Sequence, residues 1–279
     1  MPTVSIVVPA YNAEETLPAT LSSIFLQGFS DYECFIVDDH STDKTSHIAI
    51  AASEIDSRFR FIQLAQNQGV VAARNAALAQ ASGRYIAFLD SDDLWHPSFL
   101  DNSLAVHAQH FSGLVHSSYY RFRSNPASPV TLFASVTPPE IVDASNILSK
   151  NHLPLLSVVV DRDAVGDFLF PSARPEDYSL WSELIYGRGH KSISTKRYLG
   201  FYRISDNQRS SNKLKAFPRV YAFYKSFSSL PKHMALLYCA RWAAINVYQR
   251  RFSRFCPDPI AETCFSHILE HSLAFGTSI

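Results

Sequence analysis

The first ninety residues alternate short apolar runs with stretches of helical spacing, and this alternation restricts the fold more than any other feature of the chain. The expected strands are Val4–Val8, Tyr32–Val37, Phe59–Leu64 and Tyr85–Leu89. The expected helices begin near Ala13, cover Thr45 to Ala52, and cover Val70 to Ala81. Strands that alternate with helices are typical of a mostly parallel sheet flanked by helices. The sequence therefore predicts an α/β fold.

Polar and acidic residues follow several of these strands at their carboxyl ends. They are Pro9-Ala10-Tyr11-Asn12, Asp38-Asp39 and Asp90-Ser91-Asp92-Asp93. The carboxyl ends of parallel strands meet at one edge of a sheet, where the ligand crevice lies. Carboxylates there are costly without a cation or a hydrogen-bonding ligand, and a hard divalent ion that bridges phosphate oxygens is the commonest partner. The Asp-x-Asp sequence thus predicts a metal–diphosphate site, with an acidic helix cap as the alternative.

The composition excludes several classes of protein. The 279 residues suffice for one large domain, or for a domain with an appendage, and 47% hydrophobic with 18% charged residues exclude a disordered chain. Lys+Arg and Asp+Glu both number 25, which gives no support for a nucleic-acid partner. Scattered cysteines and a start that enters a strand directly predict a reduced, cytoplasmic protein.

The rest of the chain is less regular. The expected elements are a helix over Leu94 to His110, a strand over Gly113–Tyr120, an exposed loop from Asn125 to Pro139, a strand over Leu155 to Asp161, a helix over Tyr178 to Gly187, a strand over Lys191–Tyr198, and closing helices from Phe217 onward. Arginines among the aromatic residues of these last helices suit packing on the main domain or peripheral contact with an anionic membrane.

Arg74 and Asp177 are charged candidates outside the strand ends. Gly69 predicts a turn, and Arg74 lies one helical turn further on, where it would meet a phosphate or pair with Asp39. Glu176-Asp177 precedes an expected helix. Such a pair suits a helix N-terminus, and a separate carboxylate also suits a general base.

Together these segments resemble the family 2 inverting glycosyltransferases, which have the GT-A fold. The matching residues are Ser5 to Asn12, Val37 to Asp43, Asn67-Gln68-Gly69 with Ala73-Arg74-Asn75, Phe88 to Asp93, Arg174 to Trp181, and Tyr202-Arg203 with Arg209-Ser210-Ser211. The match is strong over about residues 3 to 100 and gives nothing beyond about residue 214. Family relatives often carry a histidine two residues after the Tyr-Arg arginine, where this chain has Ser205, so Arg203 and Lys213 would carry more of the charge.

The resemblance implies a role for each matching residue. Pro9, Tyr11 and Asp39 would hold the nucleotide base, and Arg74 and Arg203 would stabilise the uridine end or the phosphates. Asp90 would meet the ribose or the metal, and Asp92 would bind Mn²⁺ or Mg²⁺. Asp177 would be the base, and Glu176 and Trp181 would contact the acceptor or have a supporting role. The implied activity moves a sugar from a nucleotide sugar, expected to be a UDP-sugar, to a hydroxyl of a glycan or lipid-linked acceptor in bacterial polysaccharide biosynthesis.

The resemblance also implies a division of the chain. Residues 1–214 would form the GT-A domain, with a nucleotide-sugar part at about 1–100 and an acceptor part at about 101–214. Beyond the resemblance, the helical spacing of aromatic residues and arginines from Phe217 onward predicts that residues 215–279 form a helical C-terminal extension. The protein is expected in the cytoplasm, or peripherally at the inner face of the plasma membrane.

Two other readings of the whole chain remain. A phospho-receiver would use Asp90 as the phosphorylated residue, but it needs paired aspartates on the first strand, where Val4–Val8 lies. A catalytically silent sugar- or nucleotide-binding relative has no support, since the aspartates and the candidate base are present. The H-x-x-E-H sequence from His267 to His271 has no third ligand in view and is expected to be an ordinary helix surface.

Overall fold

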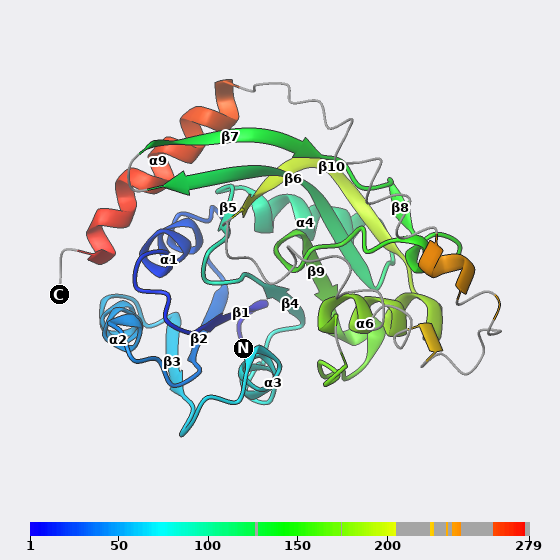
Figure 1. The fold of residues 1–279 in the computed structure, drawn as a ribbon, viewed down its shortest axis with the longest axis horizontal. Helices are drawn as coiled ribbons and strands as arrows, with labels where there is room; N and C mark the ends of the chain where they lie inside the picture. The colour runs from blue at the N-terminus through cyan, green and yellow to red at the C-terminus, as the bar shows by residue number, and fades with distance from the viewer. Residues whose placement is uncertain are drawn as a thin grey trace.

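The computed structural model describes residues 1–125, 128–173, 175–204, 224–225, 233, 236–240 and 259–276. These residues contain a ten-stranded sheet in the order β3-β2-β1-β4-β9-β6-β10-β5, with β7 beside β6 and β8 beside β10 (Figure 1). The strands are β1 Val4–Ala10, β2 Tyr32–Asp38, β3 Phe59–Gln63, β4 Tyr85–Phe88, β5 Leu94–Trp95, β6 Leu114–Asn125, β7 Ser128–Val136, β8 Ile141–Val142, β9 Val158–Asp161 and β10 Ser192–Arg203.

Helices cover the sheet on both faces. They are α1 Leu17–Phe25, α2 Thr45–Ile55, α3 Val70–Leu78, α4 Phe99–Gln109, α5 Arg162–Val165, α6 Glu176–Ser182 and α9 Pro259–Gly276, with 3₁₀ turns η1 Ile147–Ser149 and η2 Leu155–Ser157 and a π-helical turn η3 Glu183–Gly187. The expected α/β fold is confirmed.

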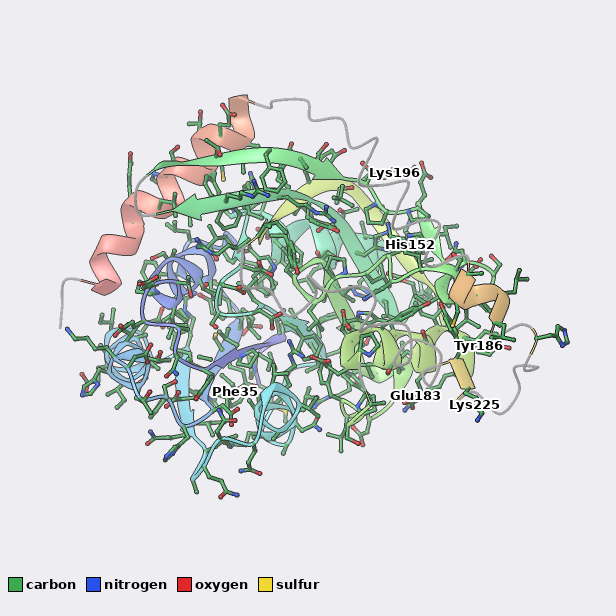
Figure 2. All side chains as sticks on the ribbon, in the orientation of Figure 1. Phe35, His152, Glu183, Tyr186, Lys196 and Lys225 are labelled. Atoms are coloured by element: carbon green, nitrogen blue, oxygen red, sulfur yellow. The ribbon has the colours of Figure 1, made fainter. Side chains whose placement is uncertain are left out.

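The N-terminal part of the sheet is parallel, as the alternating pattern predicts. β1 pairs in parallel with β2 and β4, and β2 with β3, so their carboxyl ends lie on one edge. Phe35, which Figure 2 labels, packs with Ala73 of α3 on one face. Ile36 packs with Leu21 and Ile48 of α1 and α2 on the other face. Strand β2 is therefore buried on both sides, which explains its continuous apolar run.

The second part of the sheet mixes strand directions. β9 runs antiparallel to β4 and β6, while β10 runs parallel to β6. The loop predicted from Asn125 to Pro139 is wrong over most of its length, because β7 pairs there with β6. Within the described sheet β7 pairs with no strand but β6. Such an edge tolerates Pro129, which a central strand would not.

Two predicted helices begin later than expected. The helix expected over Leu94 to His110 is wrong at its start, since Leu94–Trp95 form β5 and α4 begins at Phe99, beyond Pro97. The helix expected near Ala13 begins at Leu17. Glu14 therefore does not lie in its first turn, and its carboxylate accepts the Lys44 N–H at 3.0 Å.

Local differences also occur at β9 and α6. The strand predicted over Leu155 to Asp161 begins only at Val158, because η2 occupies the first three residues. The helix predicted over Tyr178 to Gly187 begins at Glu176 and changes to η3 after Ser182.

The C-terminal helix α9 closes one end of the molecule, beside α1 and the β6–β7 hairpin (Figure 1). The Phe265 ring lies 4.8 Å from the Phe122 ring and 5.1 Å from the Phe201 ring, between ring centroids. α9 is the part of the expected helical C-terminal extension that the structure describes, and most of the closing helices expected between Phe217 and Phe255 lie outside the described residues. In the described ranges, helices long and apolar enough to cross a bilayer are absent.

Candidate active site

An acidic turn follows β4 at the edge where the parallel strands end. The turn closes with a hydrogen bond from the Asp93 N–H to the Asp90 carbonyl at 3.0 Å. Burial, with the Asp90 charge as a second cause, raises the pKa of Asp92 to about 6. Burial, with the charges of Asp92 and Asp90 as further causes, raises the pKa of Asp93 well above its usual range. The ionised forms of Asp92 and Asp93 are thus disfavoured, first by burial and then by the neighbouring carboxylates.

Arg203 at the end of β10 holds this turn. Its backbone N–H donates to the Asp93 carboxylate at 2.8 Å, and its Nε donates to the Asp92 carbonyl at 2.7 Å. The guanidinium also lies 4.6 Å from the centroid of the Phe122 ring. The contacts made by the Arg203 N–H and Nε therefore position the acidic turn, and its role toward the uridine end or the phosphates stays a prediction.

Arg74 links the acidic turn to the start of α6. Its side chain is 3% exposed and pairs with Asp90 at 2.6 Å and with Glu176 at 3.3 Å. The guanidinium lies 5.1 Å from the centroid of the Phe170 ring. The predicted pairing of Arg74 with Asp39 is wrong, because α3 directs the side chain toward α6 and β4 rather than toward the end of β2.

Asp177 stands at the start of α6, next to the Glu176 that Arg74 binds. Its carboxylate accepts the Tyr178 N–H at 2.7 Å and the Asn151 amide at 2.8 Å. Burial and the Glu176 charge raise the pKa of Asp177 to about 6, against the opposing effects of Arg74 and these hydrogen bonds. A carboxylate with this pKa is ionised near neutral pH and is a better proton acceptor than an ordinary aspartate.

Asp39 anchors the loop that precedes α3. Its carboxylate oxygens accept the Gln68 N–H and the Gly69 N–H, each at 2.7 Å. Gly69 has φ +86°, in the left-handed region that favours glycine. The Asp39 carboxylate therefore shapes the loop at the end of β2, and its role toward a nucleotide base stays a prediction.

Pro9 and Tyr11 lie at the end of β1, on the same edge. Pro9 is buried, whereas Tyr11 is 46% exposed. The following loop is fixed by the loop after β2, since Asn12 N–H donates to the Ser41 hydroxyl at 2.9 Å and Thr42 N–H donates to the Asn12 side chain at 2.9 Å. An exposed aromatic ring on a fixed loop is suited to stacking against a flat ligand.

Trp181 lies in the core rather than in the open part of the site. It is fully buried, and its indole N–H donates to the Leu153 carbonyl at 2.8 Å. Its ring centroid is 6.3 Å from that of Phe88 at the end of β4. The buried Trp181 indole thus packs α6 against the end of β4, which favours the supporting role over contact with an acceptor.

The residues of the acidic turn fit a divalent ion that is shared with a ligand. The described ranges contain no group of three or more His, Cys, Asp or Glu side chains arranged to hold a metal ion by themselves. Mg²⁺, however, is usually bound by one or two carboxylates together with phosphate oxygens and water. Burial and the Asp90 charge, which raise the pKa of Asp92, make its ionised form costly, and a divalent ion would offset that cost.

Two contacts of the site were missed in the sequence. Asp93 carries the carboxylate that Arg203 binds, and Asn151 carries the amide that binds Asp177. Asp93 belongs to the acidic run, so its proximity to Asp92 was a usable signal. The sequence around Asn151 carried no such signal. Asn151 and Asp177 are 26 positions apart, and their contact depends on how the turn after η1 packs on α6.

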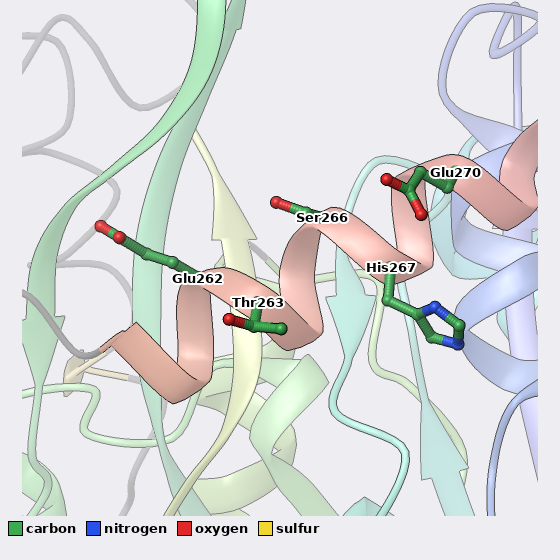
Figure 3. A pocket seen from close by; sticks show the side chains of 5 residues that line it. All are labelled: Glu262, Thr263, Ser266, His267 and Glu270. Carbon is green, nitrogen blue, oxygen red and sulfur yellow. The ribbon is translucent and has the colours of Figure 1, made fainter.

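A hollow on α9 is separate from this site. It is lined by Glu262, Thr263, Ser266, His267 and Glu270, all from one helix (Figure 3). α9 lies at the opposite end of the molecule from α6 (Figure 1). The His267–His271 sequence therefore lies on a helix surface, as expected, and is remote from Asp177.

The sequence is similar to known bacterial glycosyltransferases. Residues 5–140 match the family model described as glycosyl transferase family 2. The chain is 30% identical over 249 residues to UDP-Glc:alpha-D-GlcNAc-diphosphoundecaprenol beta-1,3-glucosyltransferase WfgD of Escherichia coli, covering 89% of this chain and 95% of that protein. It is 32% identical to the putative teichuronic acid biosynthesis glycosyltransferase TuaG of Bacillus subtilis, covering 90% of this chain and 98% of that protein.

The fold is similar to that of a solved glycosyltransferase. The crystal structure of S. aureus TarS 1–349 in complex with UDP-GlcNAc superposes with a TM-score of 0.65 at 21% identity, covering 98% of this chain and 81% of that one. At this identity the likeness concerns the fold.

Proposed function

This chain belongs to glycosyl transferase family 2 and has its GT-A fold, and we propose that it transfers a sugar from a UDP-sugar, with inversion, to a hydroxyl of a glycan or lipid-linked acceptor. The observation that carries this proposal is the pair of carboxylate sites joined by buried Arg74. The acidic turn after β4 lies on one side of Arg74, and the Glu176–Asp177 pair lies on the other. Inverting transfer needs these two separate functions.

The acidic turn would hold the donor. Asp92 and Asp90 would bind Mn²⁺ or Mg²⁺ together with the diphosphate, and the ion would offset the charge that develops on the leaving UDP. Tyr11 and Asp39, at the ends of β1 and β2, would contact the base. Support for UDP comes from the printed substrate of the E. coli relative and from the UDP-GlcNAc bound to the structural neighbour.

Asp177 would act as the base. Its carboxylate would take the proton of the acceptor hydroxyl as that oxygen bonds to the anomeric carbon and the bond from this carbon to the diphosphate breaks. Since the pKa of Asp177 is about 6, most of the carboxylate is ionised at neutral pH. One displacement on the face opposite the leaving group inverts the configuration of the anomeric carbon.

The acceptor class follows from the relatives rather than from the site. The E. coli relative is named for an acceptor linked to diphosphoundecaprenol, which is a membrane lipid. We infer that the present chain uses an acceptor of the same class, and that it works at the inner face of the plasma membrane.

UDP release from a panel of UDP-sugars tests the proposal. With Mn²⁺ and an acceptor, the wild-type protein should release UDP, and the product should carry the inverted linkage by NMR. The Asp177→Asn variant should keep UDP affinity and lose transfer by roughly 10²–10⁴-fold, the usual contribution of a general base. Retained configuration, or full activity in this variant, would refute the assigned mechanism.

A further inference from the structure

Arg121 is a cation near the candidate site, and no carboxylate of the described residues pairs with it. It lies in β6, opposite Tyr202 of β10 and Ala134 of β7. Its charge opposes the burial that raises the pKa of the Tyr119 hydroxyl, and its Nε is buried with no hydrogen-bond partner among the described residues. In that part of the chain Arg121 forms no ion pair.

Lys150 is a second cation in the same place. It follows η1, is half-buried, and forms no ion pair with a described residue. Burial lowers the pKa of Lys150, and the charge of Arg121 lowers it further, so the two side chains are close enough to repel each other. Two half-buried cations that repel each other are costly, and an anionic ligand would offset both charges.

The pair adjoins both halves of the site. Asn151, the residue after Lys150, donates the 2.8 Å hydrogen bond to the Asp177 carboxylate. The Tyr119 ring, two residues before Arg121 on β6, lies 6.1 Å from the Tyr202 ring between centroids, and Asp93 acts electrostatically on both tyrosines. Figure 2 labels His152, two residues after Lys150, on the side of the molecule that carries α6 and β10.

We propose that Arg121 and Lys150 form a binding site for a phosphate or diphosphate group of the acceptor, next to Asp177. The guanidinium offers a planar set of donors to phosphate oxygens, and the ammonium adds a mobile point charge. The donor diphosphate is assigned to the acidic turn, so this second site holds an anion on the acceptor side. The assignment rests on the proposed function, because it takes Asp177 as the group that meets the acceptor hydroxyl.

Paired acceptor analogues test this site in the full-length protein. One probe is octyl α-N-acetylglucosaminide, and the other carries a diphosphate between the same sugar and the same octyl chain. Binding of each probe is measured by calorimetry on protein already saturated with UDP and Mg²⁺, which fills the donor site. The wild-type protein should bind the diphosphate probe at least about tenfold more tightly than the neutral one, as expected for charge-assisted hydrogen bonds.

Single variants separate the site from general electrostatics. Lys150→Met and Arg121→Met should each remove most of the preference for the diphosphate probe, while affinity for UDP stays unchanged. Lys191→Met is the matched control, since Lys191 is exposed at the start of β10 and loses the same charge in the same substitution. Its preference should equal that of the wild type.

The outcomes distinguish this site from the proposed function. Equal binding of the two probes by the wild type, or an unchanged preference in Lys150→Met and Arg121→Met, would overturn the acceptor phosphate site while UDP binding still holds. Failure of the wild type to bind UDP would instead refute the proposed function. Equal losses in Lys191→Met would assign the preference to net charge and overturn the site as well.

Discussion

Asn151 lowers the pKa of Asp177, the carboxylate that we assign as the base. Its amide hydrogen bond lowers the pKa of Asp177, which burial and Glu176 raise to about 6. Asn151→Ala removes this bond, so the pKa of Asp177 should rise and the low-pH limb of the transfer rate should move to higher pH. The pH dependence of kcat/KM measures the shift, with Asn102→Ala, on α4, as a control of the same type. Identical profiles in the two variants would show that Asn151 does not act on the base.

Arg74 is the most deeply buried ion-pair partner of the site. Arg74→Met should leave Asp90 and Glu176 without their cation and cost roughly 2 kcal/mol of unfolding free energy, less than for a fully buried pair because both carboxylates reach water. Arg84→Met is the control, since Arg84 is 51% exposed and its loss should cost below about 1 kcal/mol. Urea unfolding measures both values, and equal costs would contradict the account.

At the scale of single residues, the sequence predicted where side chains lie along the chain better than what they contact. Asp90, Asp92 and Asp177 occupy the strand-end and helix-start positions expected of them. The partner of Arg74 was predicted wrongly because α3 can direct one side chain to either of two acidic strand ends. The choice depends on the approach of α6, which helical spacing does not determine.

Helix α9 packs the Phe265 ring against Phe122 of β6 and Phe201 of β10, the strand that ends in Arg203. Phe265 contacts Phe122, and the Arg203 guanidinium lies 4.6 Å from the centroid of the same Phe122 ring. Phe265→Ala should destabilise the protein by roughly 3 kcal/mol and weaken UDP binding, because Phe122 would no longer support Arg203. Phe265→Leu should cost less than about 1.5 kcal/mol. Urea unfolding and UDP titration check this, and unaltered UDP affinity in a destabilised Phe265→Ala protein would limit α9 to a structural role.

Elements were predictable where one pattern determined them. The parallel part of the sheet follows from buried β-branched runs separated by helices, and β1 to β4 lie close to their predicted bounds. β7 was missed because the prolines around it predict a loop, and only pairing with β6 at an edge makes a strand there compatible with Pro129. β5 was missed because two residues, Leu94–Trp95, carry no periodicity.

At the scale of the whole molecule, the acidic turn should make stability depend on pH and on metal. The pKa of Asp92 rises from 3.8 to about 6 on folding, so the native state binds more protons between these values. The free energy of unfolding of the metal-free protein should therefore fall as pH rises through this range. Above pH 6 the ionised carboxylate should bind Mn²⁺ more tightly, because metal and proton compete.

Thermal unfolding with and without Mn²⁺ and UDP checks this dependence. The increase in Tm caused by the two ligands together should be larger at pH 7.5 than at pH 5, and Asp92→Asn should remove most of the difference. An equal increase at both pH values in the wild type would contradict an ion bound through Asp92.

The central claim is that the turn after β4 holds a divalent ion on the diphosphate of UDP. Calorimetric titration of UDP into the protein with Mn²⁺, and again with EDTA, tests it most directly. The account predicts that Mn²⁺ raises UDP affinity at least about tenfold. It also predicts that Asp92→Ala removes the increase and that Asp163→Ala, at a side chain 70% exposed on α5, retains it. Equal UDP affinity with Mn²⁺ and with EDTA, or an unchanged increase in Asp92→Ala, would contradict the claim.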